Sequence, residues 1–422
     1  MRETDSLNTR LLLSSSYTNH QMRPAVFLLA VTLAATQARA QFDMETSRTT
    51  ASLRGVHNVG GGVAWASGTD GTVLRTEDGG YVWQLCAIPP GAEKLDFRGI
   101  QAFDQNTAIV MSSGKGDQSR IYKTSDGCQT WKLIFTNPDT FTGTIVAGSH
   151  PPDDGFFDAI LFLDSNLGLV FGDPAVGSDP VGGSFYTFRI RVTYDGGKTW
   201  TPVVDAEINS PGKNLMPLGS EGLFAASNSS AAVLDGWLWM GTGGGRVLRR
   251  RLYDNPKVRA FAFQSSYCAG AVDPISHTCG LPWTDWTSTN TPLTAPGTSA
   301  GIFSLVFRTS KVGIAVGGDY QKPHQTTSNA AYSFDGGESW QAVKTPPHGY
   351  RSSVAYDAQQ KLWITVGPNG TDISRDDGKN WTPLKPSGYD TPDTDKDWNA
   401  LSLPYVVGPH GRIGKLRTIT QK

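Results

Sequence analysis

Three aspartates are the side chains of this chain best placed for acid–base chemistry. Asp173 ends the apolar stretch GLVFGD, Asp319 ends the similar stretch GIAVGGD, and Asp158 opens the stretch FDAILF. Hydrolysis of a glycosidic bond uses two carboxyl groups about 5–10 Å apart. These aspartates are therefore the candidates for catalysis. Because Asp173 and Asp319 are equivalent in the pattern, a shared role in a turn competes with that interpretation.

Arginines open three related stretches and could bind an anion. Arg54, Arg98 and Arg351 each stand near the start of an apolar stretch that aligns with FDAILF. Converging guanidinium groups bind a carboxylate through paired hydrogen bonds. The alternative is that these arginines are solvated or paired with neighbouring carboxylates. Three aromatic side chains near the same positions could stack on a sugar ring: Tyr320, Tyr350 and Trp398.

The sequence lacks the residue patterns for binding a metal, a phosphate, a cofactor or nucleic acid. The histidines are scattered and no CxxC pair occurs, so we expect no metal site. The glycine-rich GTGGGR from Gly241 leads into another strand, which leaves no helix N-terminus for a phosphate. No nicotinamide, flavin or haem-attachment motif is visible, and we expect no cofactor. With 37 basic and 38 acidic residues, the chain has no charge excess for nucleic acid.

The elements that must position these residues repeat along the chain. Each unit has an apolar segment, a polar turn and a second apolar segment, as in FSLVFRTSKVGIAVGGD from Phe303. Units of roughly 40 residues are typical of four-stranded propeller blades, which stack into a closed ring. The sequence predicts an all-β fold, with one seven-bladed β-propeller over 41–422. We expect a strand from 42–52 to complete the short last unit, and surface loops near 177–184, 254–296 and 319–328.

A motif of the form [ST]-x-D-x-G-x-x-W follows five of the units, first as TEDGGYVW from Thr76. An aspartate followed by glycines is typical of a tight hairpin turn, and the tryptophan is an apolar anchor. We therefore interpret these residues as structural. The aspartates are Asp78, Asp126, Asp195, Asp335 and Asp376, and the tryptophans are Trp83, Trp131, Trp200, Trp340 and Trp381.

This motif resembles the Asp-box, or BNR repeat, of sialidases and related propellers. The resemblance implies that the aspartate caps a turn between two outer strands and that the tryptophan packs beneath it. The sialidase arginine motif F/Y-R-I-P is absent, and FRG at Phe97 is a partial match. Longer stretches, including RIYKTSDGCQTWKLIF, are similar to exported bacterial propellers related to the photosystem II assembly and stability factors. That resemblance spans 56–416 and implies a binding scaffold for a membrane-protein client.

Four cysteines fit an oxidising compartment. Four cysteines allow three pairings. We favour Cys86 with Cys128, because Cys128 replaces the motif glycine and a disulfide would compensate for the backbone strain. We pair Cys268 with Cys279, which lie close in sequence.

The N-terminal residues have the pattern of an export signal. From Met22 the chain has one arginine, an apolar run over 25–35 and the small-x-small sequence Ala38-Arg39-Ala40. We interpret 1–40 as a signal peptide, with Met22 as an alternative start. No later stretch is long and apolar enough to span a membrane. The mature chain should therefore be periplasmic or extracellular.

These observations favour an exported, non-catalytic propeller that binds a protein or glycan partner at the mouth of its channel. The alternative is a cell-envelope glycoside hydrolase of the BNR or sialidase-like type that uses the rim carboxylates. Convergence of two carboxylates from different blades over an aromatic floor would distinguish the two. We expect a monomer, because a closed ring leaves few strand edges for association.

Overall fold

A computed structural model describes residues 41–138, 155–178, 184–203, 215–252, 286–293, 298–384, 391 and 393–419. The expected signal peptide and the pair Cys268–Cys279 lie outside these residues. Residues 39–422 belong to one compact unit. Among the described residues, none forms a helix that is both long and apolar enough to cross a membrane.

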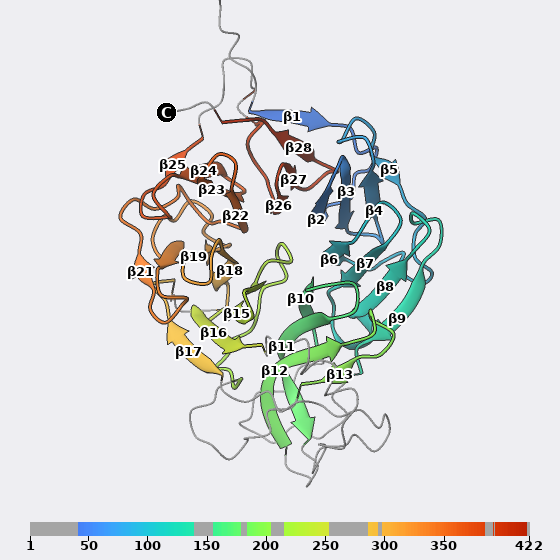
Figure 1. The fold of residues 1–422 in the computed structure, drawn as a ribbon, viewed down its shortest axis with the longest axis horizontal. Coiled ribbons are helices and arrows are strands. Elements are labelled where there is room, and N and C mark those ends of the chain that lie inside the picture. Colours follow the sequence, from blue (N-terminus) through green and yellow to red (C-terminus); the bar gives the residue numbers. More distant parts are fainter. Residues whose placement is uncertain are drawn as a thin grey trace, which may run out of the picture. The chain divides into compact units, whose positions relative to one another are not determined.

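Seven four-stranded antiparallel sheets form this unit, as the sequence repeats predict (Figure 1). We number these blades in chain order. Blade 1 has β2 (Leu53–Gly60), β3 (Val63–Gly68), β4 (Val73–Thr76) and β5 (Gln84–Leu85), and blade 2 has β6 (Phe97–Ala102), β7 (Ala108–Ser112), β8 (Arg120–Thr124) and β9 (Lys132–Thr136). Blade 3 has β10 (Phe157–Phe162), β11 (Gly168–Ser178), β12 (Ser184–Thr193) and β13 (Thr201–Pro202), and blade 4 has β14 (Ala231–Leu234), β15 (Trp237–Gly241), β16 (Arg246–Arg251) and β17 (Thr287–Asn290). Blade 5 has β18 (Ala300–Phe307), β19 (Gly313–Asp319), β20 (Ala330–Ser333) and β21 (Gln341–Ala342), and blade 6 has β22 (Ser353–Asp357), β23 (Leu362–Gly367), β24 (Gly370–Ser374) and β25 (Thr382–Pro383).

The two ends of the described chain meet in blade 7. This sheet combines β26 (Ala400–Ser402), β27 (Tyr405–Val407) and β28 (Ile413–Leu416) with the N-terminal β1 (Phe42–Glu45). In Figure 1 the blue β1 lies beside the red β28, and Phe42 is paired with Leu416. Asn399 Nδ2 donates a hydrogen bond to the carbonyl of Leu53 (2.8 Å), which links blade 7 to blade 1. The predicted closure by an N-terminal strand is confirmed.

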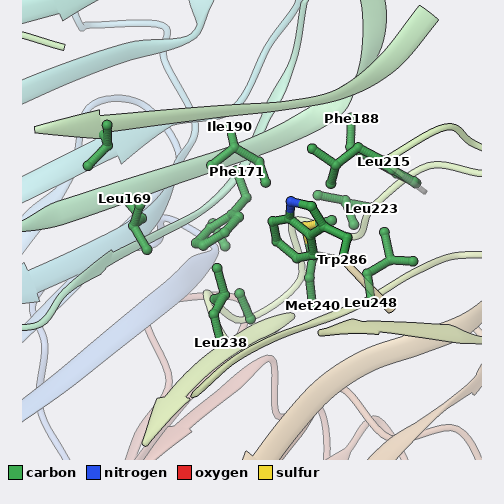
Figure 2. Packing of buried hydrophobic residues seen from close by; sticks show 13 residues of the cluster. Leu169, Phe171, Phe188, Ile190, Leu215, Leu223, Leu238, Met240, Leu248 and Trp286 are labelled. Atoms are coloured by element: carbon green, nitrogen blue, oxygen red, sulfur yellow. The ribbon is translucent and has the colours of Figure 1, made fainter. Parts of the chain in front are cut away.

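Apolar side chains fill the spaces between neighbouring blades. Because both faces of a blade are covered, inner strands are apolar almost throughout, and every residue of β7 is buried. Figure 2 shows the cluster between blades 3 and 4, in which Phe171 and Ile190 face Leu238 and Met240, with Trp286 among them. Burial of this kind supplies the main driving force for stacking the blades.

Each of the five motif turns has the same hydrogen bonds. In blade 1, Thr76 Oγ1 donates to Asp78 Oδ1 (2.8 Å) and accepts from the amide of Gly80 (3.0 Å). The amide of Val82 donates to Asp78 Oδ1 (3.0 Å). The aspartate side chain therefore closes the turn on itself. Equivalent bonds are made by Asp126, Asp195, Asp335 and Asp376.

Cys128 occupies a backbone position that favours glycine. Its φ is 64°, and it forms a disulfide with Cys86 at a sequence separation of 42 residues. The pairing favoured from the sequence is therefore present in the structure. It joins the outer edge of blade 1 to the motif turn of blade 2.

The predicted extents of two surface loops are wrong in part, because strands occupy some of their residues. The segment 177–184 contains the end of β11 and the start of β12, so these long strands extend the blade 3 hairpin. Thr287–Asn290, inside the expected loop 254–296, forms β17 and supplies the outer strand of blade 4. β17 has no buried residue and lacks the apolar pattern of an inner strand, so no pattern in the sequence indicated it.

Removing the disulfide should destabilise the propeller. The loop-entropy model gives about 4 kcal/mol for a loop of this length. The double variant Cys86→Ala/Cys128→Gly should lose about 1 kcal/mol less than Cys86→Ala/Cys128→Ala, because glycine tolerates the positive φ. Chemical denaturation of both variants measures this difference. Equal losses would show that the backbone at residue 128 relaxes without the disulfide.

The ring-closing strand should be sensitive to pH through Glu45. Burial raises the pKa of Glu45 to about 7, against the opposing effects of the Trp83 indole and Lys415. A raised carboxyl pKa favours folding below pH 4.5, and this stabilisation is lost as the pH rises through 7. Glu45→Gln should therefore gain stability relative to the wild type between about pH 5 and pH 8. Urea denaturation at each pH, with Glu93→Gln as the exposed control, checks this. A constant difference would contradict it.

Candidate functional site

The first residues of the inner strands gather at one mouth of the central channel. Arg54 is the second residue of β2, and burial lowers the pKa of its guanidinium group. Its charge interacts with Asp96, Arg98 and Tyr350, so the structure brings together residues from blades 1, 2 and 6. Three of the residues predicted from the sequence to line the rim, Arg54, Arg98 and Tyr350, are therefore neighbours.

Arg98 is held in place by two acceptors. Its Nε donates to Asp96 Oδ2 (2.8 Å), and its Nη1 donates to the carbonyl of Ala225 (3.3 Å). Within the described part of the chain, the buried Arg54 Nε atom has no acceptor and the buried Asp96 Oδ1 atom has no donor. Both atoms are enclosed, so this hydrogen-bonding capacity lies beneath the surface of the mouth.

A segment of the chain occupies the channel behind this mouth. We name residues 224–230, which lead into β14, the central segment. Asn228 Oδ1 accepts from the amide of Ile160 (2.7 Å) in blade 3, and its Nδ2 donates to the carbonyl of Ile100 (3.4 Å) in blade 2. Figure 1 shows this yellow-green loop reaching the middle of the ring.

The opposite side of the central segment is bonded to blades 5 and 6. Ser227 Oγ donates to the carbonyl of Ser352 (2.8 Å). The carbonyl of Ser229 accepts from the amide of Leu305 (2.8 Å), and Ser229 Oγ donates to Ser304 Oγ (2.7 Å). The segment therefore connects blades 2 and 3 with blades 5 and 6 across the channel. Asn228 tolerates its φ of 58° because asparagine adopts the left-handed region more readily than most residues.

The candidate catalytic aspartates do not form a pair across blades. Asp158 lies in β10 and Asp173 in the adjacent β11 of the same blade. Asp158 is 1% exposed, and burial, with the nearby charge of Asp173, raises its pKa well above the usual range. Asp173 Oδ1 accepts from the amide of Leu223 (2.7 Å). A carboxyl group as enclosed as Asp158 could not reach a glycosidic oxygen unless the mouth opened.

Asp319 and Arg351 make bonds within the protein. Asp319 accepts from the amide of Gln321 (3.0 Å) and pairs with Lys322 (3.3 Å), so it stabilises the turn after β19. Arg351 is fully buried and donates through Nε to Asp372 Oδ2 (2.9 Å). This agrees with the sequence alternative in which an arginine is paired with a carboxylate. Arg351 is therefore not available to a ligand on the surface.

His348 completes the environment of this buried ion pair. Its Nδ1 lies 2.9 Å from Asp372 Oδ1, and its Nε2 lies 2.8 Å from the carbonyl of Asn369. The hydrogen bond with Asp372 raises the pKa of His348, against burial. These contacts hold the chain just before Tyr350 and so fix one wall of the mouth.

The aromatic residues fall into two groups. Tyr350 packs edge-on against Phe303 (ring centroids 4.8 Å apart), Phe303 stacks on Phe224 (3.7 Å), and Tyr320 lies beside Phe303 (6.2 Å). Tyr320 is 49% exposed and is the solvent-facing member of this group. By contrast, Trp398 is buried, donates to Asp395 Oδ1 (3.1 Å) and packs against β1. Trp398 therefore supports the closure of the ring.

A cavity of about 410 Å³ opens beside the central segment. It lies against Asp173 of blade 3 and the loop that precedes the central segment. The residues that line it are Asp173, Leu218, Gly219, Ser220, Glu221, Gly222, Leu223, Phe224, Gly243, Gly244 and Thr298.

Sequence reasoning did not identify the central segment, Asp96 or Asp372. Asp372 could have been found, since it is a lone charge in the buried strand GTDIS. The run SNSS from Ser227 also carried a signal, because four small polar residues precede an inner strand where apolar ones are usual. No group of three or more histidine, cysteine or acidic side chains suited to a metal ion occurs among the described residues.

Comparison with known proteins agrees with this architecture. The family model described as BNR/Asp-box repeat matches residues 331–342, which contain the motif turn of blade 5. The fold and its turns define the chain as an Asp-box β-propeller with seven blades. No curated protein sequence matches it.

Among solved structures, the fold is similar to that of YCF48. YCF48 bound to D1 peptide has a TM-score of 0.51 and 14% identity, with 90% of this chain and 98% of that chain covered. YCF48 from Cyanidioschyzon merolae has a TM-score of 0.51 and 16% identity, with 90% and 99% covered. The extracellular domain of BT4673 from B. thetaiotaomicron has a TM-score of 0.52 and 11% identity, with 90% of this chain and 40% of that chain covered. At these identities the likeness concerns the fold.

Replacing Asn228 by glycine should weaken the propeller without straining the backbone. The amide of Ile160 would lose its acceptor, which costs about 1–3 kcal/mol for a buried group. Asp235→Gly, at an exposed turn residue with a φ of 49°, is the matched control. It should change the free energy of unfolding by less than about 0.5 kcal/mol. Equal effects of the two variants in urea denaturation would show that the central segment does not contribute to stability.

Proposed function

We propose that this propeller is a non-catalytic binding scaffold that docks an extended segment of a protein partner across the channel mouth. The observation that carries this proposal is the central segment. It makes hydrogen bonds to four blades and so crosses the channel. A segment that crosses the channel favours a partner that lies on the mouth over a substrate that enters the ring.

The groups exposed at this mouth suit such a docking surface. Tyr320 offers a half-exposed ring supported from below by Phe303, and aromatic side chains of this kind are frequent anchors at protein interfaces. Arg98, a partly buried guanidinium beside Arg54, adds positive charge to this mouth, and guanidinium groups bind carbonyl and carboxylate oxygens. The sequence resemblance to assembly factors supports a protein partner over a glycan, and so does the D1 peptide bound to YCF48, a protein of similar fold.

An exported location fits the same proposal. The Cys86–Cys128 disulfide is of the kind that persists in oxidising compartments. The N-terminal sequence pattern predicts a signal peptide, and one protein with a similar fold is an extracellular domain. We therefore propose that the scaffold works in the periplasm or outside the cell.

The glycoside hydrolase alternative requires a different arrangement of side chains at the mouth. It requires two accessible carboxyl groups on either side of a sugar. The enclosed position of Asp158 and its location in the same blade as Asp173 do not favour it. Turnover of a glycoside panel that is lost in Asp173→Asn would nevertheless establish that alternative.

Selection from a random peptide library displayed on phage tests the scaffold proposal. Peptides enriched on the purified mature chain should lose at least tenfold in affinity for Tyr320→Ala, because the variant removes an aromatic anchor. Tyr81→Ala is the control, since Tyr81 is also exposed but lies in the motif turn of blade 1. Failure to enrich any peptide, or equal losses in both variants, would contradict docking at the mouth.

A further inference from the structure

His348 lies between a buried ion pair and the channel mouth. Its Nδ1 is 2.9 Å from Asp372 Oδ1, and its Nε2 is 2.8 Å from the carbonyl oxygen of Asn369. Both neighbours are hydrogen-bond acceptors, and only the imidazolium form of histidine has a donor on each ring nitrogen. These two contacts therefore suit the protonated ring. The side chain of His348 is 35% exposed, so solvent can exchange its proton.

Arg351 supplies a competing partner for the same ring nitrogen. Its Nη2 lies 2.8 Å from His348 Nδ1, and an arginine side chain only donates hydrogen bonds. The neutral ring with its proton on Nε2 accepts this bond, but it has no proton to donate to Asp372. Loss of one proton therefore exchanges a charge-assisted bond to Asp372 for a bond from Arg351. His348 thus has two bonding arrangements, and the pH selects between them.

The charged groups around His348 determine where it titrates. The hydrogen bond with Asp372 raises the pKa of His348 most, and the charge of that carboxylate and the carbonyl of Asn369 act in the same direction. Burial and the charge of Arg351 lower the pKa, and the net direction is upward from 6.5. Beyond these groups, Asp395 interacts with Arg351. The stabilisation from the imidazolium arrangement is therefore fully present below pH 6.5 and is lost as the pH rises through the raised pKa.

Hydrogen bonds join His348 to the loop that carries Tyr320. We name residues 320–328, which follow β19, the Tyr320 loop. Asn369, whose carbonyl faces the imidazole, donates through Nδ2 to the carbonyl of Pro323 in this loop. The amide of Tyr350 donates to the same carbonyl (2.9 Å). The position of Asn369 therefore affects the loop in which the proposed aromatic anchor lies.

The backbone on both sides of His348 is held by a separate side chain. Asn329, the residue before β20, donates through Nδ2 to the carbonyls of Pro347 (2.9 Å) and Gly349 (2.7 Å). Asn329 is 1% exposed, so these bonds are buried. Because this backbone is fixed, a change in the bonds of the imidazole ring displaces Asn369 and the loop bonded to it.

We propose that His348 is a pH-sensitive positioning residue for partner docking, whose imidazolium form holds Asn369 and the Tyr320 loop in the arrangement that binds the partner. This inference rests on the proposed scaffold function and concerns the regulation of the same mouth. Affinity for the partner is then highest at acid pH and falls as His348 loses its proton.

NMR titration of the propeller without a partner tests the coupling directly. Between about pH 5 and pH 9, the imidazole carbons of His348 should titrate with a midpoint above 6.5. The amide signals of Gln321 and Lys322 should shift with the same midpoint, because their loop follows Asn369. His348→Gln should remove this transition from the loop signals. His324→Gln is the control, since His324 is exposed in the same loop and its replacement should leave the transition in place.

Peptide affinity at two pH values tests the effect on docking. Peptides without histidine that depend on Tyr320 should bind the wild type about fivefold more weakly at about pH 8.5 than at about pH 6. The His348→Gln variant should bind them with the weaker affinity at both pH values. Equal affinities of the wild type, or a loss with pH that persists in His348→Gln, would overturn the assignment.

These experiments and the peptide selection can fail independently. If the selected peptides depend on Tyr320 but bind equally at both pH values, the scaffold function stands and the role of His348 in docking is wrong. If no peptide is enriched but the loop signals titrate with His348, the scaffold proposal fails and His348 still positions the Tyr320 loop. If the loop signals do not follow His348, this inference fails whatever the peptides do.

Discussion

The closing pair of strands is the constraint on which the rest of this structure depends. Each blade has two apolar faces and must have a neighbour on both, so the ring is stable only when its first and last blades meet. Pairing of β1 with β28 achieves this, and the buried contact between Phe42 and Trp398 supports it. The positions of all inner strands, and so of the residues at the channel mouth, follow from that closure.

A closed ring of seven blades leaves a central channel, and the central segment of this chain crosses it. Short polar side chains of this segment make hydrogen bonds with three different blades. Asn228 accepts from the amide of Ile160, Ser227 donates to the carbonyl of Ser352, and Ser229 donates to the hydroxyl of Ser304. Buried polar groups are stable when their bonds are complete, and a network that spans several elements also fixes their relative positions. Arg54, Tyr320 and Asp173 belong to blades 1, 5 and 3, and the central segment links several of these blades.

The repeat architecture was predictable because it follows from residue patterns that are local in the sequence. The motif spacing identified the tight turns, the period identified the blades, and the cysteine at a glycine position identified the Cys86–Cys128 disulfide. The partners of individual side chains were harder to predict, because alignment of the repeats places a residue along its strand but does not show which residue faces it. Arg351 had the same predicted position as Arg54, yet it forms a buried ion pair with Asp372 in β24 of the same blade. The central segment departs from the repeat, so periodicity could not reveal its path.

The central claim is that the chain itself occupies the channel and leaves the mouth as a docking surface. Residue-resolved hydrogen exchange of the unliganded protein measures this most directly. The amides of Ile160 in blade 3 and Leu305 in blade 5 donate to the central segment, which leads into blade 4 between them. In a filled channel, both should exchange as slowly as amides in the inner strands, because their bonds open only with the ring. Rapid exchange at both amides, with slow exchange elsewhere in β10 and β18, would show an open channel and contradict the claim.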